Sequence, residues 1–313
     1  MKIATTTADF DGYTPNKWDY DLLLPLFEGT GFRNIDINFY GQEKPSPAGA
    51  IPWIWDDNWR GFAKRAMDAA GENGLKLVQA HSSDSVFDEG QERGRTIELI
   101  KREFEACKLM GIPSMVVHCV LKKGNTWKEQ RETNCGFFTS LLPVLESTGV
   151  NLLIENGCFQ NGGAYHYTSA EMIKTTIHDL GNHPLVHAVW DVGHAHMQGV
   201  DQYKEIMELG KDLYALHIHD NFGNADVHLA PYTGTCCYDA ILKGLMDSGY
   251  NGYFTMEGNS IPTPKAHGRS GYELNGVNYN RLVDLPLDLK KQSERLMYET
   301  AKYMLRQYDC YEE

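Results

Sequence analysis

The sequence predicts an α/β protein built as a single (β/α)8 TIM barrel. Eight short, β-rich apolar runs alternate with eight helical patterns, and this alternation predicts a parallel sheet. The runs show little polar alternation, which is typical of strands buried on both faces. Eight units within 313 residues most simply close into a barrel. A doubly wound open sheet is the alternative, and the lack of a GxGxxG motif after the first run weakens its dinucleotide-binding form.

The predicted strands begin at the N-terminus and recur along the chain. They are Lys2–Thr6, Arg33–Asn38, Leu75–Ala80, Ser114–Cys119, Val150–Glu155, Leu185–Asp191, Leu213–Ile218 and Gly252–Glu257. The predicted helices carry apolar residues at three- and four-residue spacing. They are Asp19–Glu28, Trp59–Glu72, Glu89–Met110, Lys128–Ser147, Ser169–Leu180, Val200–Leu209, Tyr238–Ser248 and Leu289–Tyr308. Gly31, Gly74 and Gly111 stand at helix-to-strand junctions, where glycine commonly ends a helix.

No Pro- or Ser-rich linker divides the chain, so we expect one domain over residues 1–313. Two long loops, residues 39–58 and 259–287, interrupt the alternation, and the C-terminal helix 289–308 follows the second. Trp53, Trp55 and the nearby Trp59 either stack on a sugar ring or close a lid over the mouth, or they pack against the first helices or form a subunit contact. The second loop carries Lys265, His267, Arg269 and Arg281.

Composition excludes several classes of protein. The net charge is −13, from 42 acidic and 29 basic residues, and this disfavours binding to nucleic acid. No apolar run is long enough to span a membrane, and the N-terminus lacks the apolar region of a signal peptide. The seven cysteines are odd in number, scattered and free of CxxC pairs, which fits a reducing compartment. We therefore expect a cytoplasmic protein without a membrane or nucleic-acid partner.

Six consecutive predicted strands end in a residue of a metal-ligating type. These residues are His81, His118, Glu155, Asp191, His217 and Glu257, with His219 just beyond the seventh strand. Active-site residues of barrels lie at these strand ends. A single carboxylate there is most simply a helix cap, and a single histidine a wall residue. Six in succession predict a divalent cation, because converging carboxylates repel one another unless a cation offsets their charge.

The loops after the sixth and seventh strands add further ligand types. His194 follows Asp191 by three residues, and Asp226 and His228 repeat the two-residue spacing of His217 and His219. Alternate residues of an extended segment share a face. A mixed set of Glu, Asp and His suits Mn²⁺, Zn²⁺, Co²⁺ or Mg²⁺ and does not choose among them.

Four motifs resemble those of the xylose isomerase-like barrels, the sugar phosphate isomerase/epimerase superfamily. They are LLIENG, VWDVGHAH, LHIHDNFGNADVH and FTMEGN, which end the fifth to eighth predicted strands. The resemblance implies one divalent ion held by Glu155, Asp191, His217 and Glu257, and no nucleotide cofactor. It also implies that Glu155 and Glu257 form an acid/base pair. This pair would abstract a proton next to a carbonyl, through a metal-stabilised enediolate.

The remaining site residues are assigned to substrate binding by the same resemblance. They are His81, His118, His194, His219, Asp226 and His228. The implied partner is a small sugar or sugar phosphate, whose identity the sequence leaves open. A homo-oligomer also stays open.

Three other functions remain alternatives. The superfamily also contains endonuclease IV-type enzymes, and an endonuclease IV-like trinuclear zinc phosphoesterase would use His81 and His118, and His194, Asp226 and His228, as extra ligands. The net charge of −13 and the lack of Arg or Lys runs disfavour this phosphoesterase. The HIHDN motif also resembles the sugar-converting members more than the nucleases. An inosose dehydratase-like lyase would use the same metal and carboxylates. A barrel that binds a sugar without converting it is the third.

Two departures from the family pattern bear on the reaction. The second predicted strand offers Asp36 where many sugar-converting members carry Glu. The stretch after His217 lacks the Arg that is usual in ketose 3-epimerases. Isomerase, epimerase and dehydratase activities therefore all stay open.

Overall fold

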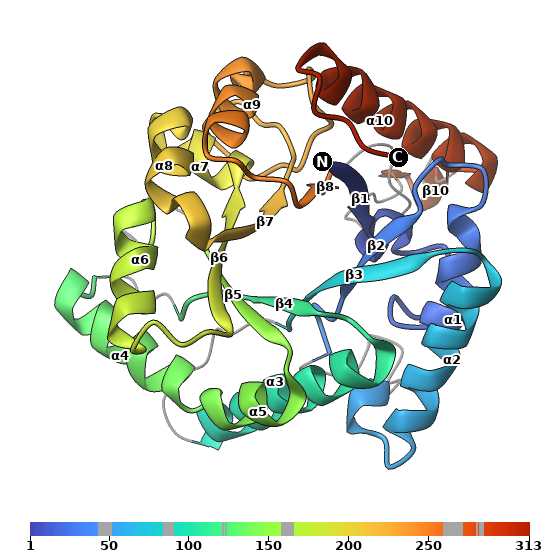
Figure 1. The fold of residues 1–313 in the computed structure, drawn as a ribbon. Coiled ribbons are helices and arrows are strands. Elements are labelled where there is room, and N and C mark those ends of the chain that lie inside the picture. Colours follow the sequence, from blue (N-terminus) through green and yellow to red (C-terminus); the bar gives the residue numbers. More distant parts are fainter. Residues whose placement is uncertain are drawn as a thin grey trace.

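The computed structural model of the protein describes residues 1–42, 52–83, 91–120, 122, 124–157, 166–258, 272–279, 281 and 285–313. Eight parallel strands lie in the order β7-β6-β5-β4-β3-β2-β1-β8 and are ringed by helices, which confirms the predicted barrel (Figure 1). The strands are β1 (Lys2–Thr6), β2 (Asn34–Asn38), β3 (Lys76–His81), β4 (Ser114–Val117), β5 (Asn151–Glu155), β6 (Val186–Asp191), β7 (Leu213–His217) and β8 (Tyr253–Met256).

The barrel closes between β7 and β8 by a short contact. β8 pairs in parallel with β1 over four residues, from Lys2 with Tyr253 to Thr5 with Met256. On its other side, β8 meets the chain just after β7 through one isolated bridge, between Ile218 and Met256. Two hydrogen bonds make this bridge: the Ile218 N–H donates to the Thr255 carbonyl at 2.8 Å, and the Glu257 N–H donates to the Ile218 carbonyl at 2.9 Å.

Ten α-helices are described, most of them on the outside of the barrel (Figure 1). They are α1 (Tyr20–Leu23), α2 (Trp59–Glu72), α3 (Gln91–Met110), α4 (Trp127–Thr139), α5 (Leu142–Thr148), α6 (Ala170–Asp179), α7 (Val192–Gln198), α8 (Gln202–Leu209), α9 (Tyr238–Asp247) and α10 (Leu287–Gln307). Four 3-10 turns cover Thr7–Phe10, Leu24–Phe27, Trp53–Trp55 and Gly210–Asp212. Within the described residues, no helix combines the length and apolarity that crossing a membrane requires.

Proline divides two of the predicted helices. The predicted helix 128–147 is two helices, because Pro143 lacks the N–H that a continuous helix needs and instead lies in the first turn of α5. The predicted helix 19–28 is the four-residue α1 followed by a 3-10 turn that contains Pro25. The short α7, which follows β6 directly, had no counterpart in the prediction.

The two predicted long loops contain ordered elements. In the first, Trp53 is buried and stacks on Phe62 of α2, with ring centroids 6.2 Å apart, so Trp53 packs against a helix. In the second, β9 (Tyr272–Leu274) and β10 (Val277–Tyr279) form an antiparallel hairpin. Its turn residues Asn275 and Gly276 both have positive φ, as a two-residue hairpin turn requires. Lys265, His267 and Arg269 lie outside the described residues.

Candidate metal centre

The inward-facing side chains of β4 to β7 form two layers. The lower layer is a small buried apolar cluster of Val116, Leu153, Val189 and Ala215. Residues two positions further along a strand lie on the same face. The layer above, toward the mouth formed by the C-terminal strand ends, consists of His118, Glu155, Asp191 and His217. Strand periodicity thus aims four of the predicted site residues into one space above an apolar floor.

His217 lies at the centre of the four predicted metal ligands. Its Nδ1 is 2.8 Å from Glu155 Oε1, 3.6 Å from Glu257 Oε2 and 3.9 Å from Asp191 Oδ2. All four side chains are buried. Ligand atoms of Glu155, Asp191 and His217 lie within 4.8 Å of one another, and so do those of His81, His217 and Glu257. Small side-chain shifts would let such atoms bind one ion.

The electrostatics of this group favour a cation. Burial alone would raise the pKa of Glu155, but His217 and His118 hold that pKa well below its usual value. Burial alone would lower the pKa of His217, but Glu257 and Glu155 raise it well above its usual value. Within the described part of the chain, the ion-pair partners of Glu155, Asp191 and Glu257 are all histidines. Either protons on the imidazoles or a metal ion can supply the positive charge.

His81 and His118 face the second oxygen of Glu155. Glu155 Oε2 lies 2.8 Å from His118 Nε2 and 3.5 Å from His81 Nε2. The two Nε2 atoms are 3.1 Å apart. His81 Nδ1–H donates to the Ser82 carbonyl at 2.9 Å, so the neutral ring carries its lone pair on Nε2, which is turned toward the site. His81, His118 and Glu155 therefore form a second group of ligand atoms within 4.8 Å.

Asp226 joins the histidines on the other side of the centre. Its Oδ2 lies 3.4 Å from His194 Nε2 and 3.3 Å from His228 Nε2. His219 Nε2 lies 3.0 Å from Asp191 Oδ1, and the rings of His219 and His228 stack with centroids 4.0 Å apart. Burial alone would lower the pKa of His228, but Asp226 raises it to about 9. All ten predicted site residues thus lie in one connected cluster, while their individual roles stay predictions.

Two residues behind His217 were not among the predicted site residues. Asp36 of β2 is fully buried, and its Oδ2 lies 3.7 Å from His217 Nε2. Gln79 of β3 lies between them: its Nε2 donates to Asp36 Oδ2 at 2.6 Å and is 3.0 Å from His217 Nε2. Both positions carried a signal in the sequence, since Asp36 lies near the end of the second strand and Gln79 interrupts an apolar run two residues before His81.

Asn156 and the start of α7 fix the position of Asp191. The Asn156 side chain accepts a hydrogen bond from the Asp191 N–H at 2.7 Å and donates one to the Asp191 carbonyl at 2.9 Å. Asp191 Oδ1 accepts a hydrogen bond from the His194 N–H at 2.7 Å and so caps α7. Gly193 in the first turn lets the His219 ring approach, because a Cβ atom there would overlap that ring.

A buried charged cluster lies beside the centre, between β1 and α10. Asp9 follows β1 and accepts a hydrogen bond from Thr5, which is paired with Met256 of β8. Lys290 Nζ lies 2.6 Å from Glu294 Oε1 on α10, and neither side chain is exposed. Burial raises the pKa of Asp9 to about 6, although Lys290 opposes this shift. Sequence patterns did not reveal this cluster, because it joins residues from opposite ends of the chain.

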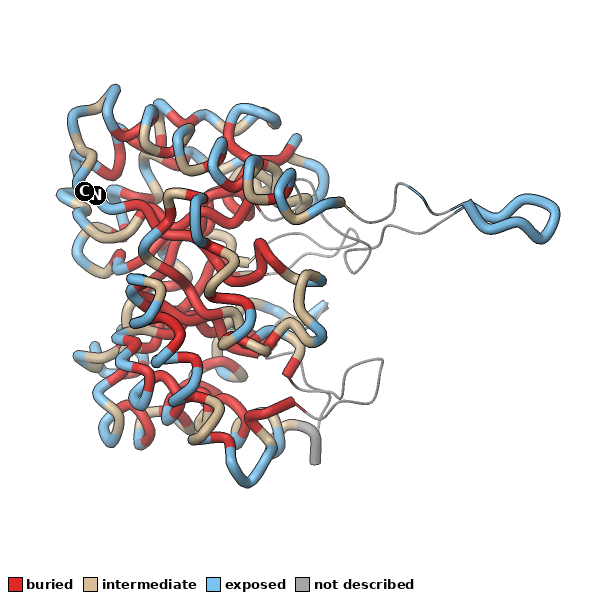
Figure 2. The backbone as a smooth tube through the Cα atoms, turned by 90° about the vertical axis from the view of Figure 1, so that its right-hand side faces the viewer, coloured by how far each residue is buried: buried red, intermediate tan, exposed pale blue. Residues whose placement is uncertain are grey.

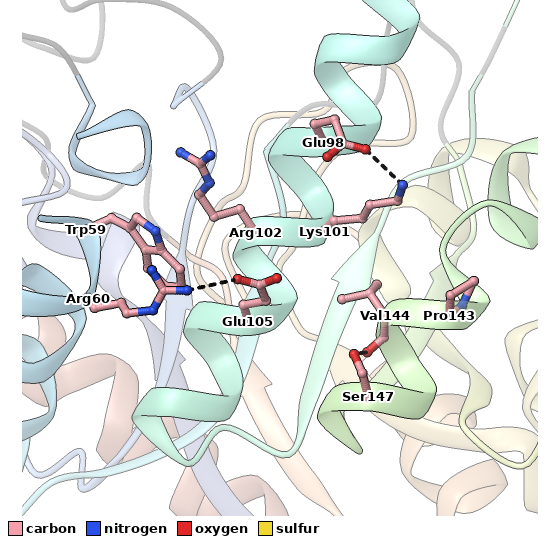
Figure 3. A pocket seen from close by; sticks show the side chains of 9 residues that line it. All are labelled: Trp59, Arg60, Glu98, Lys101, Arg102, Glu105, Pro143, Val144 and Ser147. Carbon is pink, nitrogen blue, oxygen red and sulfur yellow. Dashed lines mark hydrogen bonds and ion pairs between the residues drawn. The ribbon is translucent and has the colours of Figure 1, made fainter. Parts of the chain in front are cut away.

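A groove on the outer wall of the barrel is unrelated to these residues. It has a volume of about 440 Å³ and lies between α2, α3 and α5 (Figure 3). Four of its charged side chains pair with one another: Arg60 lies 3.7 Å from Glu105, and Lys101 lies 2.9 Å from Glu98. The fifth, Arg102, donates to the Ile54 carbonyl at 2.8 Å. No predicted site residue lines it. The predicted site residues are therefore gathered at the barrel mouth.

Sequence comparisons identify a family and two relatives of the chain. A family described as xylose isomerase-like TIM barrel matches residues 28–273. The uncharacterized protein y4fM of Sinorhizobium fredii is 26% identical over 253 residues, which cover 72% of this chain and 77% of that protein. The uncharacterized protein MJ1311 of Methanocaldococcus jannaschii is 24% identical over 174 residues, 54% of this chain and 58% of that protein.

Solved structures with similar folds span nearly the whole chain. A D-psicose 3-epimerase from Clostridium cellulolyticum H10, solved with D-tagatose, has a TM-score of 0.69 at 16% identity, over 97% of this chain and 99% of that chain. The 3-keto-D-glucoside 4-epimerase from E. coli has a TM-score of 0.66 at 16% identity, over 96% and 99%. A xylose isomerase domain protein from Alicyclobacillus acidocaldarius has a TM-score of 0.69 at 18% identity, over 98% of both chains. At these identities the likeness is one of fold.

Proposed function

Because the chain belongs to the xylose isomerase-like TIM barrel family, we propose that it is a divalent-metal-dependent isomerase or epimerase of a sugar or sugar phosphate. The observation that carries this proposal is the convergence of Glu155, Asp191 and Glu257 on His217 within one buried space. Two proteins of similar fold are named as sugar epimerases, which supports the choice of reaction class.

The donor set fits a divalent ion. Three buried carboxylates and an imidazole offer the oxygen and nitrogen ligands that Mn²⁺, Zn²⁺ and Co²⁺ accept. Glu155 Oε2 is buried and accepts no hydrogen bond within the described residues, although His118 and His81 lie close to it. Glu155, Asp191, His217 and Glu257 would hold the ion. A bound ion would polarise substrate oxygens and stabilise the negative charge that deprotonation creates.

Glu155 and Glu257 would carry the proton transfers. They reach His217 from β5 and from the end of β8, so their carboxylates approach the central space from different sides. One carboxylate would take the proton from the carbon next to the carbonyl, and the other would return a proton to the opposite face. The neighbouring His217 and His118 hold the pKa of Glu155 low, so its carboxylate would be ionised before the proton transfer.

The residues toward the rim would bind the sugar. The side chains of His118, Asp226 and His228 keep 20–32% of their surface exposed, whereas those of Asp191 and His217 have none. A substrate would therefore meet these three first, and its hydroxyl groups can exchange hydrogen bonds with their ring nitrogens and carboxylate oxygens. His81 and His194 lie deeper and would contact the end of the sugar nearest the ion.

Solvent deuterium tests the reaction directly. The purified protein, loaded with Mn²⁺ or Co²⁺, is incubated in D₂O with a panel of ketoses and ketose phosphates. Turnover should place deuterium on the carbon next to the carbonyl. The variants Glu155→Gln and Glu257→Gln should each abolish incorporation, while Glu98→Gln on α3 should leave it unchanged. No incorporation with any substrate, or full activity in both site variants, would refute the proposal.

A lyase would give a different product from the same residues. If a hydroxyl group next to the proton-abstraction site left instead of the proton returning, the product would be lighter by one water. Mass spectrometry of the reaction mixture distinguishes the inosose dehydratase-like reaction from isomerisation.

A multinuclear phosphoesterase is the second candidate, because three of the five overlapping groups of ligand atoms found among the described residues could each hold an ion. His81, His118 and Glu155 form one, Glu155, Asp191 and His217 the next, and His194, His219, Asp226 and His228 the third. The chain's charge of −13 opposes a DNA substrate. Elemental analysis after chelator-free purification separates the candidates: about three zinc ions per chain with cleavage of abasic-site DNA favours the phosphoesterase, and one ion without cleavage favours the sugar enzyme.

A further inference from the structure

The hairpin of β9 and β10 has one apolar face that its own chain leaves uncovered. Tyr272 pairs with Tyr279, and Leu274 pairs with Val277. Directly paired residues of an antiparallel ladder share a face, so these four side chains lie together, and Glu273 and Asn278 lie on the other face. The four apolar side chains are 48–64% exposed. We call residues 272–279 the hairpin arm.

The arm projects from the mouth side of the barrel. In Figure 2 it extends well away from the barrel, on the side opposite the two chain ends. Met1 precedes β1 and lies where the strands begin, so the opposite side is the one where they end. An isolated two-stranded hairpin is marginally stable in water. A protruding apolar face of this kind calls for a partner surface.

A second uncovered apolar surface runs along α10. Leu289, Leu296 and Tyr303 are spaced by seven residues, so they lie on one side of the helix, and they are 45–67% exposed. Ser293 and Thr300 lie on one edge of this row, and Glu299, which pairs with Arg295 at 2.9 Å, lies on the other edge. We call Leu289, Leu296 and Tyr303 the α10 stripe. Tyr13 Oη donates to the Leu285 carbonyl near the start of α10, while the Met1 amino group donates to the Cys310 carbonyl beyond its end.

We propose that the protein forms a two-fold dimer in which the hairpin arm of each chain docks on the α10 stripe of the other. Both surfaces come from one chain, and a two-fold axis pairs each with its counterpart twice. The arm leaves from the mouth side, and α10 begins on that side, since its other end lies next to Met1. Two chains facing each other by their mouths would therefore bring each arm onto the first turns of the partner helix.

The area agrees with a stable dimer. Four half-exposed side chains, two of them aromatic, present about 400 Å² of largely apolar surface. One docked arm would bury this area and a similar area of the stripe. Two docked arms would bury about 1,600 Å² in total, within the range of specific protein interfaces. One arm alone would bury half of that, which favours a reciprocal arrangement.

Light scattering after size exclusion, from low to high micromolar concentration, tests the proposal. The wild-type chain should be a dimer. The double variant Leu274→Lys/Tyr279→Lys on the arm should be monomeric, and so should Leu296→Lys on the stripe, because each buries charge against an apolar surface. The dissociation constant should rise by about tenfold or more in each case. Thermal unfolding should show both variants folded, since all three positions are exposed.

Matched controls and a mixture complete the test. Glu273→Lys on the other face of the arm and Leu22→Lys, an exposed leucine on α1, should both remain dimeric. An equal mixture of the arm and stripe variants retains one intact arm and one intact stripe and should recover part of the dimer. A monomeric wild type would overturn the proposal, as would a dimer that persists in the arm variant. A dimer that persists in Leu296→Lys would overturn the α10 stripe as the docking site.

Discussion

His217 is held from both ring nitrogens. Nδ1 faces Glu155, and Nε2 faces Gln79 and Asp36. A histidine that gives its Nδ1 lone pair to an ion carries its proton on Nε2 and needs an acceptor there. The Asp36 carboxylate, 3.7 Å from Nε2, can accept from that proton, and Gln79 holds this carboxylate in place by donating to it at 2.6 Å. Asp36 and Gln79 are therefore positioning residues for a metal ligand.

Asp36→Asn should weaken metal binding, because His217 would lose the carboxylate behind its ring. The expected loss of affinity is about 10- to 100-fold. Competition with a chromophoric chelator measures it without reference to turnover. Asp57→Asn, at an exposed position before α2, serves as the control. Equal affinities in the two variants would mean that Asp36 does not orient the ligand.

Asp9 predicts a pH dependence of stability. Its folded-state pKa is raised from 3.8 to about 6, mainly by burial, so the folded state binds the proton more tightly than the unfolded chain. This contribution to the free energy of unfolding is complete below about pH 4 and is lost as the pH rises through about 6, a change of about 3 kcal/mol. Burial and Asp9 also raise the pKa of Glu294.

Asp9→Asn should therefore remove much of that loss. The free energy of unfolding of the wild type should fall between about pH 4 and pH 7, and that of the variant should fall less. This difference in slope does not depend on which protein is more stable at a single pH. Urea denaturation at several pH values measures the slope. Asp288→Asn, at an exposed position at the start of α10, should keep the wild-type slope. An unchanged slope in Asp9→Asn would contradict the buried titration.

At the scale of elements, the junction of β6 and α7 couples backbone to site. The strand passes into the helix without a loop, and Asp191 is both the end of β6 and the cap of α7. His219 packs against this turn at Gly193 and contacts Asp191 at 3.0 Å. The short helix thus fixes the positions of Asp191 and His219 relative to each other.

Gly193→Ala should disturb the site, because the new methyl group overlaps the His219 ring. We expect metal affinity and turnover to fall by about 10- to 100-fold, since small displacements of reacting groups are costly. Gly71→Ala in α2 is the control: nothing lies within 4 Å of the added Cβ. It should raise the free energy of unfolding by about 0.5 to 1 kcal/mol. Identical behaviour of the two variants would refute the coupling.

The strands were predictable because their signal is local. Each predicted strand overlaps the observed one, and the inward direction of Glu155 and Asp191 follows from strand periodicity alone. At Pro143 the proline was a local signal for a helix boundary, but the prediction followed the apolar spacing across it. The NG turn at Asn275-Gly276 was a local signal for the hairpin, but residues 259–287 were predicted as a loop. These errors concern a helix boundary and a turn, and they leave the predicted order of the eight barrel strands unchanged.

At the scale of the molecule, the contacts that the sequence could not reveal form only when the barrel closes and the two ends of the chain meet. Asp9 meets Lys290 and Glu294 only when the two ends of the chain come together, and no spacing in the sequence encodes that contact. The face of the arm and the stripe of α10 are likewise visible only once burial is known. The ten predicted site residues cluster because every strand of a parallel barrel ends at the same side.

Metal removal should lower the stability of the whole molecule. An ion present at 100 times its dissociation constant stabilises the folded state by about 2.7 kcal/mol. For a chain of this size, chelation should lower the Tm by about 4 °C. Differential scanning calorimetry with and without EDTA measures this, and Glu155→Gln should respond less. An equal Tm in both conditions would show that the folded protein holds no ion.

The short seam between β7 and β8 gives the ion a further task. Among the described residues, the one backbone bridge between these strands is at Ile218, with His217 on one side of it and Glu257 on the other. An ion bound by both residues would act as a clasp across the weakest point of the barrel. Amide hydrogen exchange at Ile218 and Glu257 would then slow when the ion binds. The same few ligands would then control both the local opening of the barrel at this seam and its catalytic activity.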